Sequence, residues 1–330
     1  MRSIQQQLKE ITEVLLSPVA SYNEIRMGCH ALKDLYCRAV DFNEAEAARQ
    51  KNIQTKGGDA VSAYIAALCI TDMMRTRKFL LGIKEAIEER SKTNSHQPVT
   101  ILYAGTGPFA TLLTSLTPFF GPEQMQWILL EINPLSFGYL QKTIQQFGLE
   151  KYITSAEQAD AIQYSLPEKY KADILLSETM RSALEKEPQV AIIANLLPQC
   201  KQDAILIPQK ITIEACLLGN LAADPPAKKI LQTLLELDRA TTLQIKNCAV
   251  VSDGIIVNIP RKQNKNYTRI ALTTSVNVFG KHIIDLNESG ITLPEPVINI
   301  DVIKNYPARL FFKYRMATKP GFDFQLIAGN

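Results

Sequence analysis

The sequence has few of the side chains that build metal centres or disulfide frameworks. Among its 330 residues are three histidines, His30, His96 and His282, and none stands at ligand spacing from another histidine or from a cysteine. We therefore expect no zinc site and no other metal. The six cysteines form no Cys-x-x-Cys pair and lie in apolar surroundings, so we expect reduced core thiols in a cytoplasmic protein.

Charge of one sign is also scarce. The 36 lysines and arginines nearly balance the 33 aspartates and glutamates, and the formal net charge is +3. Such a small, evenly spread charge argues against binding to nucleic acid or to an anionic membrane surface. No apolar run reaches the roughly 18 residues of a membrane-spanning helix, and residues 1–10 lack the apolar core of a signal peptide. With 46% hydrophobic residues and no internal repeat, the composition is typical of a soluble globular protein.

Three stretches of different character follow one another along the chain. Residues 1–92 are expected to be helical throughout, because apolar residues such as Ile4 and Leu8 recur at helical spacing. Within this stretch, residues 57–59 (Gly-Gly-Asp) interrupt the pattern and offer a cap for a helix that begins near Ala60. We expect a helical N-terminal domain whose last helix contributes to a pocket in the next domain.

Residues 93–214 alternate between short apolar runs and helical stretches. The runs span residues 99–104, 125–131, 151–155, 172–177 and 203–208. This alternation predicts an α/β domain in which a mostly parallel, Rossmann-like sheet is covered by helices on both faces.

Residues 215–330 are rich in β-forming residues. Five such runs, separated by turn sequences, span residues 243–251, 254–259, 268–278, 297–303 and 309–316. A helical segment is expected near 227–237. We predict a C-terminal antiparallel β domain with a helical insertion near its start.

The first apolar run of the middle domain ends in a turn suited to a nucleotide. Gly105 and Gly107 carry no Cβ, so the backbone can turn sharply there and approach a ligand closely. The helix expected after Pro108 would point its amides at the same place. Glu131 ends the next run, where its carboxylate can accept hydrogen bonds from both hydroxyls of a ribose. Residues Gly105 to Ala110 also fit the Gly-x-Gly-x-x-Ala fingerprint of NAD-dependent dehydrogenases, and a tight turn without a ligand is a further alternative.

Two other residues fit the same pocket. Asp160 follows the third apolar run, where its carboxylate can accept a hydrogen bond from an adenine amino group, although it can equally cap a helix. Arg75 lies on an amphipathic helix upstream of the glycines and can clamp a carboxylate in a bidentate pair. The alternative for Arg75 is a place on a solvated cationic face.

The chain from about Ala60 to Glu214 resembles the protein arginine methyltransferases, which are class I S-adenosylmethionine-dependent enzymes. Residues 72–76 (Asp-Met-Met-Arg-Thr) resemble the family's Asp-x-x-Arg-Thr helix, and residues 101–107 resemble its glycine motif. The resemblance implies a class I methyltransferase fold and S-adenosylmethionine as the cofactor. It also implies which residues bind that cofactor: Arg75, Ala104, Gly105, Gly107, Glu131 and Asp160.

The second half of the resemblance lies on the substrate side. Residues 177–180 (Ser-Glu-Thr-Met) resemble the start of the family's double-glutamate loop, and Glu187 follows Glu178 at the family's spacing of nine residues. The resemblance implies that Glu178 and Glu187 are the catalytic pair that holds a guanidinium, with Met180 on the substrate side. It further implies a homodimer. The contact is expected either at the helical segment near 227–237, where the family has its dimerisation arm, or at the N-terminal helices.

The chain also departs from the family's pattern. Tyr103 stands in place of the usual acid of the glycine motif, and Arg181 replaces a glycine after Met180. The family's C-terminal His-Trp pair is absent, because no tryptophan follows His282 and the single tryptophan is Trp127. His282 is a candidate base on the substrate side, with a surface or turn histidine as the alternative.

The absent His-Trp pair and the helical N-terminus, which is larger than the family core needs, favour a small acceptor over a protein tail. We therefore predict N-methylation of a guanidino group in a small-molecule guanidine or amine, such as free arginine or a derivative. Two alternatives keep the methyltransferase chemistry: a protein arginine methyltransferase, or a methyltransferase for another small nucleophile. Two others stay open as well: an NAD-dependent oxidoreductase, and a cofactor sensor without catalysis.

Overall fold

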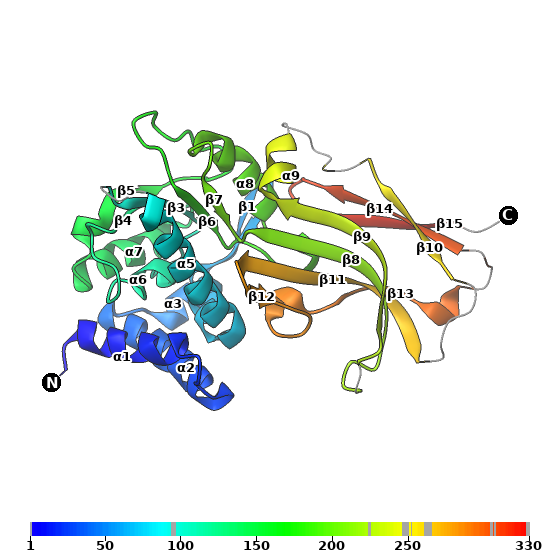
Figure 1. The fold of residues 1–330 in the computed structure, drawn as a ribbon, viewed down its shortest axis with the longest axis horizontal. Coiled ribbons are helices and arrows are strands. Elements are labelled where there is room, and N and C mark those ends of the chain that lie inside the picture. The colour runs from blue at the N-terminus through cyan, green and yellow to red at the C-terminus, as the bar shows by residue number, and fades with distance from the viewer. Residues whose placement is uncertain are drawn as a thin grey trace.

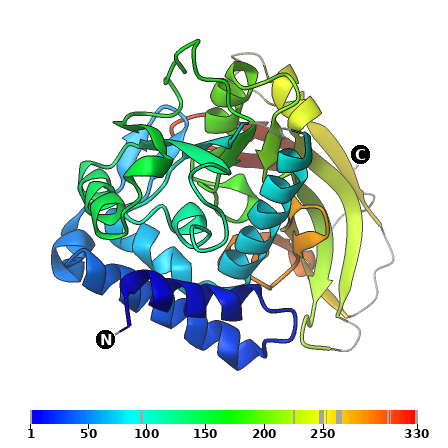
Figure 2. The same ribbon diagram turned by 60° about the vertical axis from the view of Figure 1, so that its left-hand side comes forward.

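The fold is that of a computed structural model, which describes residues 2–93, 97–223, 226–245, 251, 253–260, 266–303, 306 and 308–327. Helices dominate its N-terminal part: α1 (Ile4–Leu16), α2 (Tyr22–Ala39), α3 (Glu44–Arg49), α4 (Ala63–Leu68) and α5 (Met73–Thr93). Serines begin the first two, since the Ser3 side chain accepts from the Gln6 amide and Ser21 forms a capping box with Glu24. Figure 2 shows α1 and α2 side by side along one side of the molecule.

The prediction that residues 1–92 are helical throughout is wrong between α3 and α4. A two-stranded antiparallel hairpin lies there, formed by β1 (Ile53–Thr55) and β2 (Gly58–Ala60). Gly58 has a φ of 140°, which favours glycine, and the Thr55 hydroxyl donates to its carbonyl at 2.6 Å. The cap of α4 is accordingly Ser62, whose side chain accepts from the Ile65 amide, and not residues 57–59.

The central sheet confirms the predicted α/β class. Its order in the described part of the chain is β5-β4-β3-β6-β7, and every neighbouring pair is parallel. The strands are β3 (Val99–Ala104), β4 (Met125–Glu131), β5 (Ile153–Gln158), β6 (Ile174–Ser177) and β7 (Ile205–Ile207). The strands β3, β4, β6 and β7 fall within predicted apolar runs, because strands covered on both faces read as continuous apolar sequence. The half-buried edge strand β5 only overlaps the predicted run 151–155 and extends beyond it to Gln158. The connecting helices are α6 (Thr111–Thr114), α7 (Pro134–Gln146) and α8 (Gln189–Leu196).

The order of this sheet identifies where a ligand fits. The chain builds outward from β3 to β4 and β5, then returns to place β6 and β7 on the other side of β3. Such a reversal leaves a crevice at the carboxyl ends of the strands, where ligands of open α/β sheets bind. The carboxyl ends of β3 and β6 flank this crevice.

The C-terminal part is antiparallel, as predicted. One sheet contains β8 (Lys210–Gly219), β9 (Lys228–Asp238), β11 (Tyr267–Phe279), β12 (His282–Ile284) and β13 (Glu295–Asn299). A second contains β10 (Ile255–Ile259), β14 (Ala308–Arg315) and β15 (Gly321–Ile327). Figure 1 shows these strands at the end of the molecule opposite to α1 and α3.

Three expectations for this part need correction. The segment near 227–237 is not a helix but strand β9, which pairs with β8 from Lys210↔Asp238 to Leu218↔Lys228, so pairing with a long neighbour overrides the local pattern. The start of the run 243–251 belongs to the short helix α9 (Arg239–Gln244), which Asp238 caps, while residues 246–250, with Cys248, lie outside the described residues. The boundary after Glu214 falls inside β8, all of which belongs to the C-terminal sheet.

One hydrophobic core connects the three parts. It includes Leu15 and Tyr36 from the N-terminal helices, Trp127 from the central sheet, and Leu272 and Phe312 from the C-terminal strands. Among the described helices, none combines the length and the apolar character that crossing a bilayer requires.

Candidate active site

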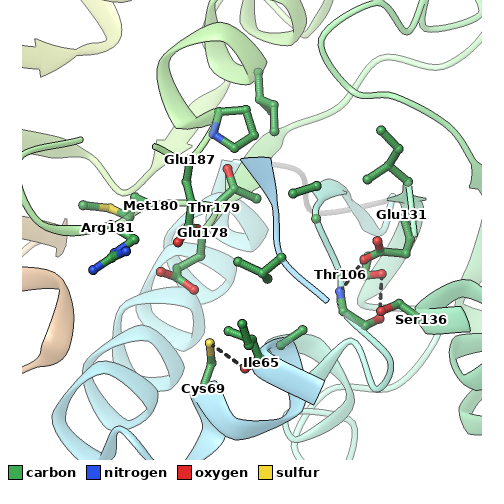
Figure 3. Close-up of a pocket in the computed structure, with 18 of the residues that line it drawn as sticks. Ile65, Cys69, Thr106, Glu131, Ser136, Glu178, Thr179, Met180, Arg181 and Glu187 are labelled. Carbon is green, nitrogen blue, oxygen red and sulfur yellow. Dashed lines mark hydrogen bonds between the residues drawn. The ribbon is translucent and has the colours of Figure 1, made fainter. Parts of the chain in front are cut away.

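A cavity of about 520 Å³ lies at the crevice of the central sheet. Its walls come from the β1–β2 hairpin, α4, the start of α5, the carboxyl ends of β3, β4 and β6, and two later segments, 178–188 and 290–293. Figure 3 shows Thr106, Glu131 and Ser136 on one side of this cavity and Glu178, Glu187 and Arg181 on the other. The two halves of the sequence prediction therefore meet in one space.

The glycine turn forms the floor beneath this cavity. Gly105 and Gly107 have φ values of 74° and 63°, a region that side chains rarely adopt. A Cβ at Gly105 would collide with the Thr179 side chain, and one at Gly107 would lie 3.3 Å from the Cβ of Ala66. The expectation of a helix directly after Pro108 is only partly met, because α6 starts at Thr111 and spans 4 residues. The amide of Gly107 points instead at Glu131.

Glu131 ends β4 in a fixed position beside the turn. Its carboxylate accepts from the Gly107 amide at 2.7 Å and from the Asn133 amide at 2.8 Å. Burial raises the pKa of Glu131 to about 7, although these backbone hydrogen bonds favour the ionised form. Nearby, the buried hydroxyl of Ser136 has no hydrogen-bond partner among the described residues. An acceptor and an unsatisfied hydroxyl thus face the cavity together.

Two other predicted cofactor residues are placed differently. Asp160 lines the cavity but accepts from the Ile162 amide and the Gln163 side chain, so it stabilises its own turn as well. Ala104 is fully buried in β3 and is not part of the cavity wall. Its contribution is the packing behind the glycine turn.

Arg75 lies in the cavity wall and forms an ion pair with Glu178. Their side chains are 14% and 8% exposed, so the pair is largely removed from water. Burial raises the pKa of Glu178 to about 7 even though the Arg75 charge opposes the shift. The second carboxylate oxygen, Oε1, is buried and has no hydrogen-bond partner among the described residues. Glu178 therefore keeps one acceptor atom free for a donor from a ligand.

Glu187 faces the same cavity from the far end of the loop. It is half-buried, and burial raises its pKa while the charges of Arg75 and Arg181 oppose that shift. The loop between the two glutamates is tightly folded, with φ values of 53° at Ala183 and 65° at Lys186. Such left-handed residues persist only where the surroundings hold them.

Side chains outside the predicted set hold this loop. Buried Gln189 accepts from the Thr179 amide at 3.0 Å and donates to the Ser177 carbonyl at 3.0 Å. The Tyr314 hydroxyl donates to the Leu184 carbonyl at 2.8 Å. The sequence analysis missed both residues. An available signal was Gln189 itself, a polar residue that comes directly before the apolar stretch 190–194 of helix α8.

The structure places the two residues predicted for the substrate side differently. Met180 is buried and lines the cavity. His282 is not part of the cavity wall; it lies on β12, where its Nε2 is 2.8 Å from the carboxylate of Glu85 on α5. The structure therefore does not bring His282 to the reacting side, and its contact joins β12 to α5.

A segment that the sequence analysis did not single out occupies this side of the cavity. Gly290, Ile291 and Leu293 line it. Asp72 anchors the segment, accepting from the Ser289 hydroxyl at 2.6 Å and from the Gly290 amide at 2.9 Å. The motif that contains Arg75 thus also positions the wall beside the double-glutamate loop.

Comparison with solved structures identifies the architecture. The chain aligns with PRMT1 of Trypanosoma brucei, from its enzyme–prozyme heterotetrameric complex with AdoHcy, at 13% identity and a TM-score of 0.54, over 81% of this chain and 93% of that one. It aligns with PRMT6 bound to SAH at 12% identity and a TM-score of 0.55, covering 80% and 99%. Another PRMT6 structure gives 12% identity and a TM-score of 0.56, covering 80% and 98%. The chain has the fold of the protein arginine methyltransferases.

This likeness concerns the fold alone, because the sequences have diverged far. No protein-family model matches the chain, and no curated protein does. The neighbours are matched over nearly their whole length, so the shared fold includes the central sheet and the C-terminal β region.

Proposed function

We propose that the protein is an S-adenosylmethionine-dependent methyltransferase that methylates a guanidino group of a small molecule, such as free arginine or a derivative. The observation that carries this proposal is the convergence of Glu178 and Glu187 in the cavity that also contains the glycine turn and Glu131. Neighbours of the same fold bind AdoHcy or SAH, the product of that cofactor, which supports the choice of cofactor.

The residues on one side of the cavity fit the cofactor. Gly105 and Gly107 form a cradle that a Cβ would fill, and Glu131 and Ser136 offer polar atoms beside it. Arg75 is the cation of this region and would hold the cofactor's carboxylate in a charge-assisted pair. In the structure that cation pairs with Glu178, so binding of an anionic group would compete for it.

The residues on the other side fit a guanidinium. When bound, the cofactor supplies an electrophilic methyl group on a sulfonium. Glu178 and Glu187 can each accept hydrogen bonds from a guanidinium and thereby concentrate its positive charge on the nitrogens that do not react. The free Oε1 of Glu178 is an acceptor already buried without a partner among the described residues, which costs free energy until a donor arrives. The reacting nitrogen would form its bond to the methyl carbon as the carbon–sulfur bond breaks and leaves a neutral thioether. It would lose its proton late, to the carboxylate of Glu178 or Glu187 or to water, because a free guanidinium is a very weak acid.

The test of the catalytic pair uses isosteric variants. We expect Glu178→Gln combined with Glu187→Gln to lower kcat for arginine or a related guanidine at least about a hundredfold, with cofactor binding retained. Glu185→Gln, which removes a carboxylate from the same loop but outside the cavity wall, is the control and should keep its activity. Unchanged turnover in the double variant would reject the assigned role.

The cofactor assignment has its own measurement. S-adenosylmethionine and NAD are titrated separately into the wild-type protein and into Arg75→Ala by calorimetry. Micromolar binding of S-adenosylmethionine that is lost in the variant supports the proposal. Binding of NAD alone would instead identify an oxidoreductase, and Glu178 and Glu187 would then be structural acids.

A protein acceptor is the second candidate, favoured by the fold shared with PRMT1 and PRMT6. Transfer of labelled methyl groups from the cofactor distinguishes the two. Label in the protein fraction of a cell extract supports the second candidate, and label confined to small molecules supports the first.

A further inference from the structure

Arg181 is a cation at the cavity wall that the proposed chemistry does not use. It follows Met180, is exposed, and lines the same cavity as Glu178 and Glu187. Figure 3 shows Arg181 on the same side of the cavity as Glu178 and Glu187, away from Glu131. Other arginines near the domain contacts are engaged: Arg75 with Glu178, Arg90 with Asp203, and Arg77 with the Ser17 carbonyl. No side-chain hydrogen bond or ion pair of Arg181 is formed within the described ranges.

The backbone around Arg181 is nevertheless fixed. The Arg181 carbonyl accepts from the Leu184 amide at 3.1 Å. The next residue, Ser182, is buried and donates its hydroxyl to the Leu293 carbonyl, and the Ala183 amide donates to the Thr274 hydroxyl at 2.8 Å. A free guanidinium on a fixed base is a group positioned to receive a ligand, because little backbone order remains to be lost on binding.

The charge of Arg181 conflicts with an acceptor that is only a cation. A guanidinium bound between Glu178 and Glu187 would lie near Arg181, and like charges at close range oppose binding. Lys186, exposed in the same wall, adds to this repulsion. An acceptor that also carries a carboxylate removes the conflict, since each of its charged groups then meets the opposite sign.

The wall beside Arg181 is apolar. Ile291 and Leu293 line the cavity there, and the hydrogen bond from Ser182 keeps this wall next to the loop. Leu293 is 50% exposed, so part of its apolar surface is open to cover by a ligand. An aliphatic spacer between the two charged groups of a ligand would bury that surface.

We infer that the acceptor is an ω-guanidino carboxylic acid, whose carboxylate is bound by Arg181 while its guanidinium is held by Glu178 and Glu187. This inference rests on the proposed function and narrows its substrate class. Arg181, which replaces a glycine of the protein arginine methyltransferase pattern, thus determines specificity. Its planar guanidinium is suited to a carboxylate because it can donate two parallel hydrogen bonds.

The test compares two probes that differ in one group. Arginine carries the carboxylate, and agmatine is the same molecule without it. In Arg181→Ala we expect the KM for arginine to rise about tenfold to a hundredfold, with kcat little changed and the KM for agmatine unchanged or lower. Arg181→Lys should restore part of the affinity for arginine, because an ammonium keeps the charge without the fork. Arg49→Ala, which removes an exposed charge from α3 away from the cavity, is the control.

Two results would overturn the inference. If the wild-type protein methylates agmatine as efficiently as arginine, the carboxylate contributes nothing and the proposed carboxylate site does not exist. Equal effects of Arg181→Ala on both probes would show that Arg181 acts on the loop or on Glu187 instead.

Failure of the proposed function itself gives a different pattern. In that case the wild-type protein binds S-adenosylmethionine but methylates neither probe. The carboxylate site is then tested by the binding of arginine and agmatine instead of by their methylation. Arginine is then titrated by calorimetry into protein saturated with S-adenosylhomocysteine. Binding of arginine, weaker for agmatine and lost in Arg181→Ala, supports the carboxylate site, whereas equal binding of both probes or none rejects it.

Discussion

At the scale of single residues, burial makes the carboxyl groups of Glu131, Glu178 and Glu187 in the cavity wall harder to ionise. Glu131 and Glu178 each have a pKa of about 7, against 4.5 for an exposed glutamate. The folded protein therefore retains protons that the unfolded chain has released. The stabilising contribution of these groups is complete below about 4.5 and is lost as the pH rises through about 7. Without ligands, the protein therefore loses stability when the carboxyl groups ionise at the site where the proposed ligands bind.

Glu131 provides the first prediction at this scale. The rise of its pKa from 4.5 to about 7 corresponds to about 3 kcal/mol of stability lost between pH 4.5 and pH 7. Glu131→Gln, which cannot ionise, should show a shallower fall of the unfolding free energy over this range. Urea unfolding at several pH values measures it. A slope equal to that of the wild type would mean that Glu131 titrates normally.

The same residue predicts how cofactor affinity depends on pH. A carboxylate accepts hydrogen bonds from a ribose better than a carboxylic acid does, so S-adenosylmethionine should bind more tightly as the pH rises through about 7. This rise should be absent in Glu131→Gln. Glu178 still ionises over the same pH range in that variant and, by holding Arg75, would weaken the binding of the cofactor's carboxylate as the pH rises. Calorimetric titrations of S-adenosylmethionine from pH 6 to pH 8 measure this pH dependence for the wild-type protein and for Glu131→Gln.

At the scale of elements, the turn between β3 and α6 has the strictest backbone requirement in the site. Gly105→Ala places a side chain at a φ of 74° and against Thr179. We expect a loss of about 1–3 kcal/mol in unfolding free energy together with loss of S-adenosylmethionine binding. Gly138→Ala is the matched control, because its Cβ would meet no atom within 4 Å in the middle of α7. It should gain about 0.5–1 kcal/mol and keep the cofactor. Equal denaturation midpoints for the two variants would contradict this account.

The elements differ in how far sequence alone predicted them. The strands β3, β4 and β6 were predictable, because strands buried on both faces leave continuous apolar runs. Strand β9 was not, because its apolar residues also fit a helical spacing, and only pairing with β8 decides between the two. The hairpin β1–β2 was missed because three-residue strands carry little pattern, although Gly58 marked its turn.

At the scale of the whole molecule, the N-terminal helices are continuous with the methyltransferase-like core. The Tyr36 hydroxyl is 2.8 Å from that of Ser115 near α6, and both residues are buried. The Arg77 side chain on α5 donates to the Ser17 carbonyl after α1 at 2.6 Å. We expect the three parts to unfold in one transition, because they share one hydrophobic core.

Tyr36→Phe tests this coupling. It leaves the buried Ser115 hydroxyl without that partner and should lower the unfolding free energy by about 1–3 kcal/mol, moving a single transition. Tyr22→Phe, at an exposed position at the start of α2, should change it by less than about 0.5 kcal/mol. Two separate transitions in thermal unfolding would show that the N-terminal helices form an independent domain.

The homodimer stays a prediction, and its contact cannot be a helical arm at 227–237, where β9 lies. Exposed apolar side chains on and beside α2, at Val19, Tyr22 and Met27, remain as a candidate contact surface. Light scattering after size exclusion should give twice the mass of one chain. A monomer mass would remove the expected dimer.

The sequence by itself determined the central sheet and the glycine turn, because both depend on local pattern along the chain. The catalytic role of Glu178 and Glu187 came from the resemblance to a family and stays a prediction. The tertiary structure alone decided three other matters. It paired Arg75 with Glu178, moved His282 to Glu85, and brought Leu293 beside Arg181. These contacts join residues about 100 or more positions apart in the sequence. Local sequence preferences cannot predict which residues so far apart will meet. Only the packing of the C-terminal strands against α5 and the double-glutamate loop sets them.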